Sequence, residues 1–254
     1  MSSDNNRSDG MSSESICSSS DKCNTGSRPA HLVPQGHDAN YAVIFDLDGT
    51  LVDTTKSFDE TIKQMVQKYS GAPLFDQEIA DLRQEGGYND DWVTTAELLR
   101  RRGFSEPLSK IVQEATELYL QLAPSNEFAL FDDQLLFEIS ERHPLFIVTG
   151  RTRPEYNPIW GERLDPLFKR VYCLHDVPGK APKPSPDYLL QLMIDFNLEA
   201  GVYVGNAVDD MWAARDANLS RIGITSTLPA DALSAAGAQI VLESVNELRK
   251  VFSL

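Results

Sequence analysis

The sequence is poor in basic residues, in cysteine and in long apolar runs. Its 23 lysines and arginines stand against 38 aspartates and glutamates, which gives a formal net charge of −15. Because non-specific nucleic-acid binding needs basic side chains to neutralise phosphates, this balance argues against a nucleic-acid partner. No run approaches the roughly 18 apolar residues of a membrane-spanning helix, so no membrane partner is expected either.

The three cysteines are Cys17, Cys23 and Cys173. Two lie in a polar N-terminal segment and the third in a predicted strand, so we expect a reducing compartment rather than a disulfide framework. The four histidines show no ligand spacing with the cysteines, which argues against a zinc site. The N-terminus lacks the apolar region of a secretory signal and carries acids, which transit peptides usually lack. We therefore predict a cytoplasmic protein.

The N-terminal residues 1–39 are rich in Ser, Asn, Asp and Gly. We predict that this segment is disordered, because it cannot bury enough apolar surface to offset the entropy of an ordered chain. Ordered structure begins with YAVIFDLDG at 41–49, where a short apolar run leads into acids and a glycine. This pattern is typical of a buried strand followed by a tight turn.

Four helix patterns follow with no strand between them, at 57–71, 75–85, 89–103 and 107–123. Strands and helices then alternate to the end of the chain. This order predicts an α/β fold, a doubly wound parallel sheet with helices on both faces. We assign the α/β core to residues 40–54 and 131–254, and a small inserted helical domain to residues 55–130.

Ligand sites in such sheets lie at the carboxyl ends of the strands. Asp46 and Asp48 come directly after the first predicted strand, in the string FDLDGT. One carboxylate can act as a nucleophile and form an acyl phosphate, and a second can protonate the leaving oxygen and later deprotonate water. Two aspartates alone would indicate a solvated turn, but the whole string is too long to be a chance match.

Two further segments suit a phosphoryl group. Thr149 and Gly150 follow the strand pattern LFIV and offer a hydroxyl and backbone N–H groups to a phosphoryl oxygen. Lys183, in GKAPKPSPD before a predicted helix, can neutralise charge on the phosphoryl group and the nucleophile. Lys180 lies in the same loop and competes for this role.

The fourth segment is GNAVDD, after the strand pattern GVYV. Asn206, Asp209 and Asp210 offer oxygen ligands for a hard cation. An acid near the start of a helix also interacts favourably with the helix dipole, so Asp209 and Asp210 have a structural explanation as well.

In this order, the four segments resemble the haloacid dehalogenase (HAD) superfamily of phosphatases over residues 40–254. The resemblance implies a Rossmann-like core and a helical cap between the first and second motifs. It implies that Asp46 is the nucleophile and Asp48 the general acid/base. Aspartates at both positions favour phosphatases over the dehalogenase branch, which generally lacks the second one.

The same resemblance implies that Thr149 binds the phosphoryl group and that Lys183 is the stabilising cation. A Mg²⁺ cofactor would be held by Asp46, the backbone carbonyl of Asp48, and motif-four oxygens from Asn206 and Asp210. The family usually has an aspartate where this chain has Asn206. This exchange removes one negative charge from the ligand set, so metal affinity and turnover are expected to fall.

The predicted insert contains the segment GGYNDDW at 86–92. It resembles the cap signature Gly-Gly-x-Asn-Asp-Asp-Trp of a small subgroup of these phosphatases. Asn89 offers hydrogen bonds and Trp92 a stacking face to a substrate, although a helix start with a core tryptophan gives the same pattern. Arg151 and Arg153 are further candidates for contacts with an anionic group.

The leading prediction is a Mg²⁺-dependent phosphohydrolase that acts on a small phosphorylated metabolite. A phosphomutase of the same superfamily shares the first half of the chemistry and fits the same motifs. A phosphate-ligand-binding protein with little or no turnover is the third hypothesis, and Asn206 supports it.

Overall fold

The computed structural model describes residues 32–85, 88 and 90–254, and eight strands lie in this part of the chain. Six strands form one fully parallel sheet, and a two-stranded antiparallel sheet accompanies it. In sheet order the large sheet contains β5 (Arg170–Leu174), β4 (Leu145–Thr152), β1 (Tyr41–Phe45), β6 (Ala200–Gly205), β7 (Ser220–Ile224) and β8 (Ile240–Leu242). The small sheet pairs β2 (Val52–Asp53) with β3 (Phe128–Ala129).

Side chains of the central strand β1 alternate between two hydrophobic clusters, as the period of a strand requires. Val43 and Phe45 belong to the cluster that α5 (Asp133–Ser140), α7 (Glu162–Leu164) and α11 (Leu248–Phe252) complete, while Ala42 and Ile44 belong to the one that α8 (Asp187–Asp195) and α9 (Val208–Asp216) complete. Helices on both faces of a parallel sheet confirm the predicted α/β fold. The helical segments after the insert are α5 (Asp133–Ser140), α6 (Arg153–Tyr156), η1 (Asn157–Gly161), α7 (Glu162–Leu164), α8 (Asp187–Asp195), α9 (Val208–Asp216), α10 (Ala230–Ala235), η2 (Val245–Glu247) and α11 (Leu248–Phe252).

The strand order places β1 between β4 and β6. The chain adds β4 and β5 on one side of β1 and then returns to add β6, β7 and β8 on the other side. At such a switch point the flanking connections leave in opposite directions, which opens a crevice beyond the carboxyl ends of the strands. The segments after β1 and β6, and the carboxyl end of β4, therefore meet at one edge.

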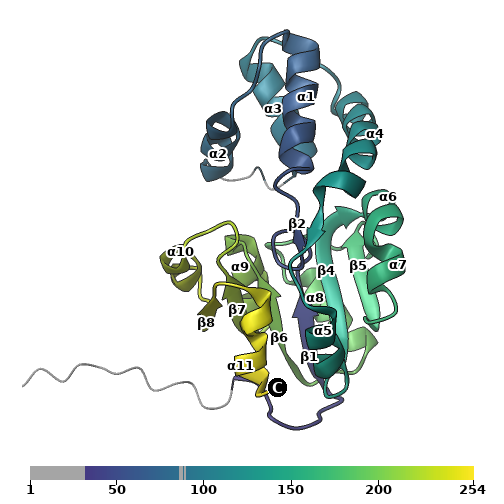
Figure 1. Cartoon of the computed structure of the whole chain (residues 1–254), viewed down its shortest axis with the longest axis vertical. Coiled ribbons are helices and arrows are strands. Elements are labelled where there is room, and N and C mark those ends of the chain that lie inside the picture. Colours follow the sequence, from purple (N-terminus) through teal and green to yellow (C-terminus); the bar gives the residue numbers. More distant parts are fainter. Residues whose placement is uncertain (1–31, 86–87, 89) are drawn as a thin grey trace, which may run out of the picture. The chain divides into compact units, whose positions relative to one another are not determined.

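In the described part of the stretch between β2 and β3 there are four helices: α1 (Phe58–Ser70), α2 (Asp76–Gln84), α3 (Asp91–Arg101) and α4 (Leu108–Asn126). Figure 1 shows them as one group of helices. Their buried side chains form a hydrophobic cluster of their own. The first and third of these helices agree with the helix patterns predicted at 57–71 and 89–103. Gly71 has a φ of 70° after α1, and the Asp90 carboxylate accepts hydrogen bonds from two backbone N–H groups at the start of α3.

The structure differs from the sequence prediction in three places. Residues 32–39 belong to the fold, because Val33 is buried in the main cluster and the Asp38 N–H donates to the carbonyl of Arg142. The strands β2 and β3 were not predicted, since two residues are too few to show a periodicity. The helix predicted after β4 is interrupted by the π-turn η1, in which Pro158 lacks the N–H that a regular ladder uses. Residues 1–31 lie outside the described part.

Among the described residues, no helix combines the length and the apolar character needed to cross a bilayer.

Candidate active site

Asp46 begins the candidate site at the carboxyl end of β1. Its N–H donates to the carbonyl of Val204 in β6, and its side chain is buried. The Oδ1 atom accepts a hydrogen bond of 2.6 Å from Lys183 Nζ. Burial raises the pKa of Asp46 to about 7, although Lys183 opposes the shift. The nucleophile predicted from the sequence thus lies beside a cation that lowers the cost of its charge.

Lys183 reaches this carboxylate from the loop before α8. Its ammonium also donates to Asp210 Oδ1 at 2.7 Å and to the Tyr203 hydroxyl at 3.0 Å. Burial opposes the lysine charge, but Asp210 and Asp46 raise its pKa well above the usual value. Lys180, the alternative considered from the sequence, is exposed. The structure therefore places Lys183, and not Lys180, at Asp46.

Asp210 links this lysine to helix α9. Its Oδ2 atom accepts hydrogen bonds of 3.0 Å from the N–H groups of both Asn206 and Ala207. Both oxygens of Asp210 therefore contact protein donors, so the carboxylate orients Lys183 and the start of α9 at once. Gly205 makes this close approach possible, because a Cβ there would lie 2.5 Å from Asp210 Oδ2.

The side-chain amide of Asn206 faces Asp46 from the carboxyl end of β6. One terminal atom of this amide lies 3.3 Å from Asp46 Oδ2 and 3.0 Å from the Asp48 carbonyl oxygen. If this atom is the amide nitrogen, it donates a hydrogen bond to both oxygens. If the amide is turned so that its oxygen lies here, the three oxygens lie side by side. The other terminal atom lies 2.8 Å from Thr227 Oγ1, whose hydroxyl can donate or accept.

This group of oxygens fits a Mg²⁺ ion. Mg²⁺ prefers oxygen ligands at about 2.1 Å in octahedral geometry, which places neighbouring ligands about 3 Å apart. The distances around Asn206 match that spacing. Among the described residues, no group of three or more His, Cys, Asp or Glu side chains could hold a metal. The fit therefore depends on a backbone carbonyl and an amide as well as on Asp46.

Asp48 lies two residues beyond Asp46, and its carboxylate is held by an arginine. Arg151 donates from Nε to Asp48 Oδ1 at 2.7 Å, and Nη2 contacts the same oxygen. The Arg151 side chain is 1% exposed, whereas that of Asp48 is 29% exposed. The arginine that the sequence indicated as a substrate contact is thus occupied by protein acceptors.

Thr149 and Gly150 lie at an irregularity of β4. The register with β5 shifts between Val148 and Thr152, so these residues bulge at the strand end. The Thr149 hydroxyl is buried near the site and accepts a hydrogen bond of 3.1 Å from the Arg151 N–H. Gly150 is exposed, and a Cβ there would meet no atom within 4 Å.

The structure places Trp92 away from Asp46, in the contact between the helical insert and the core. Its ring is 6% exposed and packs near Phe58 and Tyr119, and Nε1 donates to Glu155 Oε1 at 2.8 Å. An edge of Trp92 lines a cavity of about 450 Å³. Asn89 and the two glycines before Tyr88 lie outside the described residues.

Arg153, the second candidate anion contact, pairs with Asp176 at 2.7 Å and donates to the Val171 carbonyl. Sequence reasoning missed Tyr203, Thr227, Glu127 and Tyr119, which hold the site residues in place. Tyr203 lies in an apolar strand pattern, and Glu127 and Tyr119 lie in or beside a helix of the insert, so no local pattern indicated a link to the site.

Comparisons with known proteins find relatives of this chain. The chain is 27% identical over 188 residues to a phosphoglycolate phosphatase of Photorhabdus laumondii, and this alignment covers 72% of the chain and 80% of that protein. It is 24% identical over 242 residues to the Escherichia coli K12 phosphoglycolate phosphatase, and this alignment covers 84% of the chain and 92% of that enzyme.

Two solved structures have the same fold. A HAD hydrolase of family IA, variant 3, from Entamoeba histolytica aligns with a TM-score of 0.69 at 21% identity, over 84% of this chain and 98% of that one. A HAD-superfamily hydrolase of subfamily IA, variant 1, from Geobacter sulfurreducens aligns with a TM-score of 0.61 at 21% identity, over 87% and 100% of the two chains.

The model of the haloacid dehalogenase-like hydrolase family matches residues 43–224. This match begins in β1 and ends with β7, so it includes Asp46, Thr149, Lys183 and Asn206. The chain belongs to the haloacid dehalogenase-like hydrolases.

Proposed function

We propose that this hydrolase is a phosphatase that cleaves a small-molecule phosphate monoester through an aspartyl phosphate on Asp46. The observation that carries the proposal is the contact between Asp46 Oδ1 and Lys183 Nζ at the switch point of the sheet. A buried carboxylate next to a buried ammonium is suited to attack an anionic phosphoryl group. The relatives named phosphoglycolate phosphatase support the same reaction class.

In the first step, a carboxylate oxygen of Asp46 attacks phosphorus and the ester P–O bond breaks. Asp48 gives a proton to the leaving alcohol oxygen. In the second step, Asp48 takes a proton from water, which attacks the acyl phosphate and releases inorganic phosphate. Lys183 stays beside the phosphoryl group in both steps. The Thr149 hydroxyl donates a hydrogen bond to a phosphoryl oxygen.

We further propose that Asp46, the backbone carbonyl of Asp48 and the side-chain amide of Asn206 would hold a Mg²⁺ ion, because the spacing of their polar atoms suits it. When bound, the ion supplies positive charge for the phosphoryl oxygens. Asp210 acts behind this group, because its oxygens hold Lys183 and the start of α9. From the cysteine usage we place the activity in the cytoplasm.

The test is release of inorganic phosphate from a panel of phosphorylated metabolites with Mg²⁺. The relatives make 2-phosphoglycolate the first compound to include. We expect release by the native chain and none by Asp46→Asn, which keeps the shape of the side chain but removes the nucleophile. Equal release by both proteins would contradict the proposal. Isomerised sugar phosphate without net phosphate release would instead identify a phosphomutase.

A further inference from the structure

A buried polar network lies directly behind Asp48. Arg151 donates to Asp48 Oδ1, to the Tyr119 hydroxyl at 2.5 Å and to Glu127 Oε1 at 3.1 Å. Each nitrogen of its guanidinium therefore contacts an oxygen of the protein. Glu127 has no exposed side-chain surface, and its Oε2 lies 3.0 Å from the arginine. The arginine is thus shared between two carboxylates.

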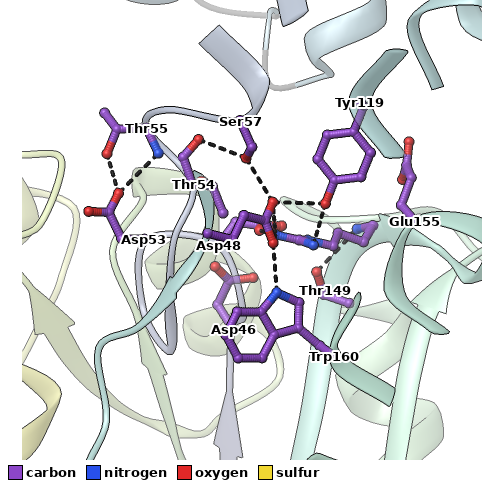
Figure 2. A network of polar contacts seen from close by, with 12 residues as sticks. Asp46, Asp48, Asp53, Thr54, Thr55, Ser57, Tyr119, Thr149, Glu155 and Trp160 are labelled. Carbon is purple, nitrogen blue, oxygen red and sulfur yellow. Dashed lines mark hydrogen bonds and ion pairs between the residues drawn. The ribbon is translucent and has the colours of Figure 1, made fainter. Parts of the chain in front are cut away.

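Glu127 gathers groups from several parts of the chain. Besides Arg151, it accepts hydrogen bonds from Ser57 Oγ at 2.7 Å, from the Tyr119 hydroxyl at 2.8 Å and from Trp160 Nε1 at 2.6 Å. Figure 2 shows Ser57, Tyr119 and Trp160 pointing toward this one centre beside Asp48. Ser57 precedes α1 and Glu127 follows α4, so the two connections between the insert and the core meet here.

Burying such a network of charged groups has an unfavourable desolvation free energy. Desolvating an arginine and a carboxylate costs several kcal/mol, and apolar side chains of similar volume often give equal or greater stability. Stability alone is therefore a weak explanation for Arg151 and Glu127. A rigid guanidinium with a fixed fork of donors does supply orientation, which a flexible or apolar side chain does not.

The hydrogen bonds at Asp48 indicate that Arg151 orients the Asp48 carboxylate. Nε and Nη2 of Arg151 both donate to Oδ1, which fixes the rotation of the carboxylate. Within the described part of the chain, Oδ2 accepts no hydrogen bond. One oxygen is therefore anchored by protein and the other is left for the reaction.

We infer that Arg151 and Glu127 are positioning residues, which hold Asp48 by Oδ1 so that Oδ2 faces the leaving oxygen of the substrate. Glu127 holds the guanidinium in turn, together with Tyr119. The inference rests on the proposed role of Asp48 as general acid/base. It differs from the sequence prediction for Arg151, since the arginine acts through Asp48 rather than on a substrate anion.

The test compares two substrates of one enzyme. Proton donation matters for a poor leaving group such as an alkoxide and much less for p-nitrophenolate. The measured quantity is the ratio of kcat/KM for an alkyl phosphate to kcat/KM for p-nitrophenyl phosphate. A misplaced Asp48 lowers this ratio, whereas a general structural defect lowers both values together.

The main variant is Arg151→Lys, which keeps the charge but loses the fork of donors. We expect its ratio to fall about tenfold or more, since general acid catalysis contributes about 10²–10⁴-fold in total. On an Asp48→Asn background the same change should have no further effect on the ratio, because a residue that acts through Asp48 has nothing left to position. Arg102→Lys, at an ion-paired arginine within the insert, is the matched control and should leave the ratio unchanged.

The outcomes separate the two proposals. If Asp46→Asn retains turnover, or Asp48→Asn keeps the native ratio, the proposed function fails. If Asp48→Asn lowers the ratio but folded Arg151→Lys does not, the positioning inference alone is overturned. Should Arg151→Lys fail to fold, Tyr119→Phe and Glu127→Gln take its place, with an expected fall of about threefold each. An unchanged ratio in these folded variants overturns the inference as well.

Discussion

Asn206 stands at the position where the resemblance to the family leads us to expect an aspartate. Its amide can present an N–H or an oxygen toward Asp46 Oδ2 and the Asp48 carbonyl. With the N–H inward, the amide satisfies both acceptors without a metal. With the oxygen inward, it completes a group of ligands that needs a cation. An aspartate has no such choice, because an ionised carboxylate only accepts hydrogen bonds.

The substitution Asn206→Asp should therefore strengthen Mg²⁺ binding, by about tenfold, because it restores a negative ligand and removes the competing N–H. Titration calorimetry of the protein with Mg²⁺, without substrate, measures this directly. Asn218→Asp adds the same charge at an exposed position and should leave the affinity nearly unchanged. Equal affinities for the native protein and Asn206→Asp would show that the amide is already an adequate ligand.

Asp91 at the start of α3 makes stability depend on pH. Burial raises its pKa to about 6, although Arg83, which donates to it at 2.7 Å, opposes the shift. The folded-state pKa thus lies above the unfolded value of about 3.9, so folding favours the protonated form. The stabilisation from this group is complete below about pH 4 and is lost as the pH rises through about 6.

We expect the free energy of unfolding of the native chain, relative to Asp91→Asn, to fall between pH 4 and pH 7. The shift sets an upper limit of about 3 kcal/mol for this change. Urea unfolding of both proteins at several pH values measures it. A difference between the two proteins that does not vary with pH would show that Asp91 ionises as freely in the folded chain as in the unfolded one.

At the scale of elements, the end of β6 and the start of α9 form one unit. Gly205 ends the strand, and Asp210 folds back from the first turn of the helix to bind the N–H groups of Asn206 and Ala207. The motif-four segment is therefore held by its own acid, and the same acid holds Lys183. A glycine is required because a Cβ would overlap the carboxylate.

Gly205→Ala should displace Asp210 and cost about 1–3 kcal/mol of stability, as overpacking typically does. It should also lower phosphate release, since Lys183 loses one of its two carboxylate partners. Chemical denaturation and the phosphate assay give the two values. Gly36→Ala, at an exposed glycine with open space around it, is the control and should stay within about 0.5 kcal/mol of the native protein. Equal stability of both variants would contradict the proposed overlap.

Some helices and strands were predicted from local sequence patterns, and others were not. The buried strand β1 and the helix α3 were predicted correctly, because an apolar run and a helical pattern depend on neighbours within a few positions. Strands β2 and β3 each have two residues, and they exist because the start and the end of the insert lie side by side. The sequence offers no signal for the pairing of Val52 with Ala129 or of Asp53 with Phe128, because the partners lie far apart along the chain.

At the scale of the whole described chain, Trp92 connects the insert with the core. Its indole N–H donates to Glu155, whose side chain is buried and whose other oxygen accepts from the Thr152 N–H. Trp92→Phe would leave one oxygen of a buried carboxylate without its donor. We expect a loss of about 1–3 kcal/mol in the free energy of unfolding. Trp212→Phe, at a tryptophan 41% exposed on α9, should cost about 0.5 kcal/mol or less.

A loss of equal size in Trp92→Phe and Trp212→Phe would mean that ring area, rather than the indole hydrogen bond, stabilises this contact. Denaturant unfolding monitored by circular dichroism distinguishes the two cases, because it does not depend on the fluorescence of the substituted tryptophan.

The sequence by itself determined the fold class and the residues that meet at the carboxyl ends of the strands. Alternating strand and helix patterns indicated the parallel sheet, and the acids, hydroxyl and lysine after its strands indicated where Asp46 and Lys183 would lie. These signals are local, because hydrophobic period and turn residues act over a few positions. Strand order then brings the carboxyl ends together as a matter of geometry.

The tertiary structure alone decided how Asp48 is held. Arg151 is 103 positions from Asp48 and 24 from Glu127, and neither separation leaves a mark in the sequence. The sequence indicated an arginine free to bind an anion, whereas the fold buries it and surrounds it with protein acceptors. Whether a charged side chain meets water or a partner depends on which distant elements pack around it, and that is settled only when the chain has folded.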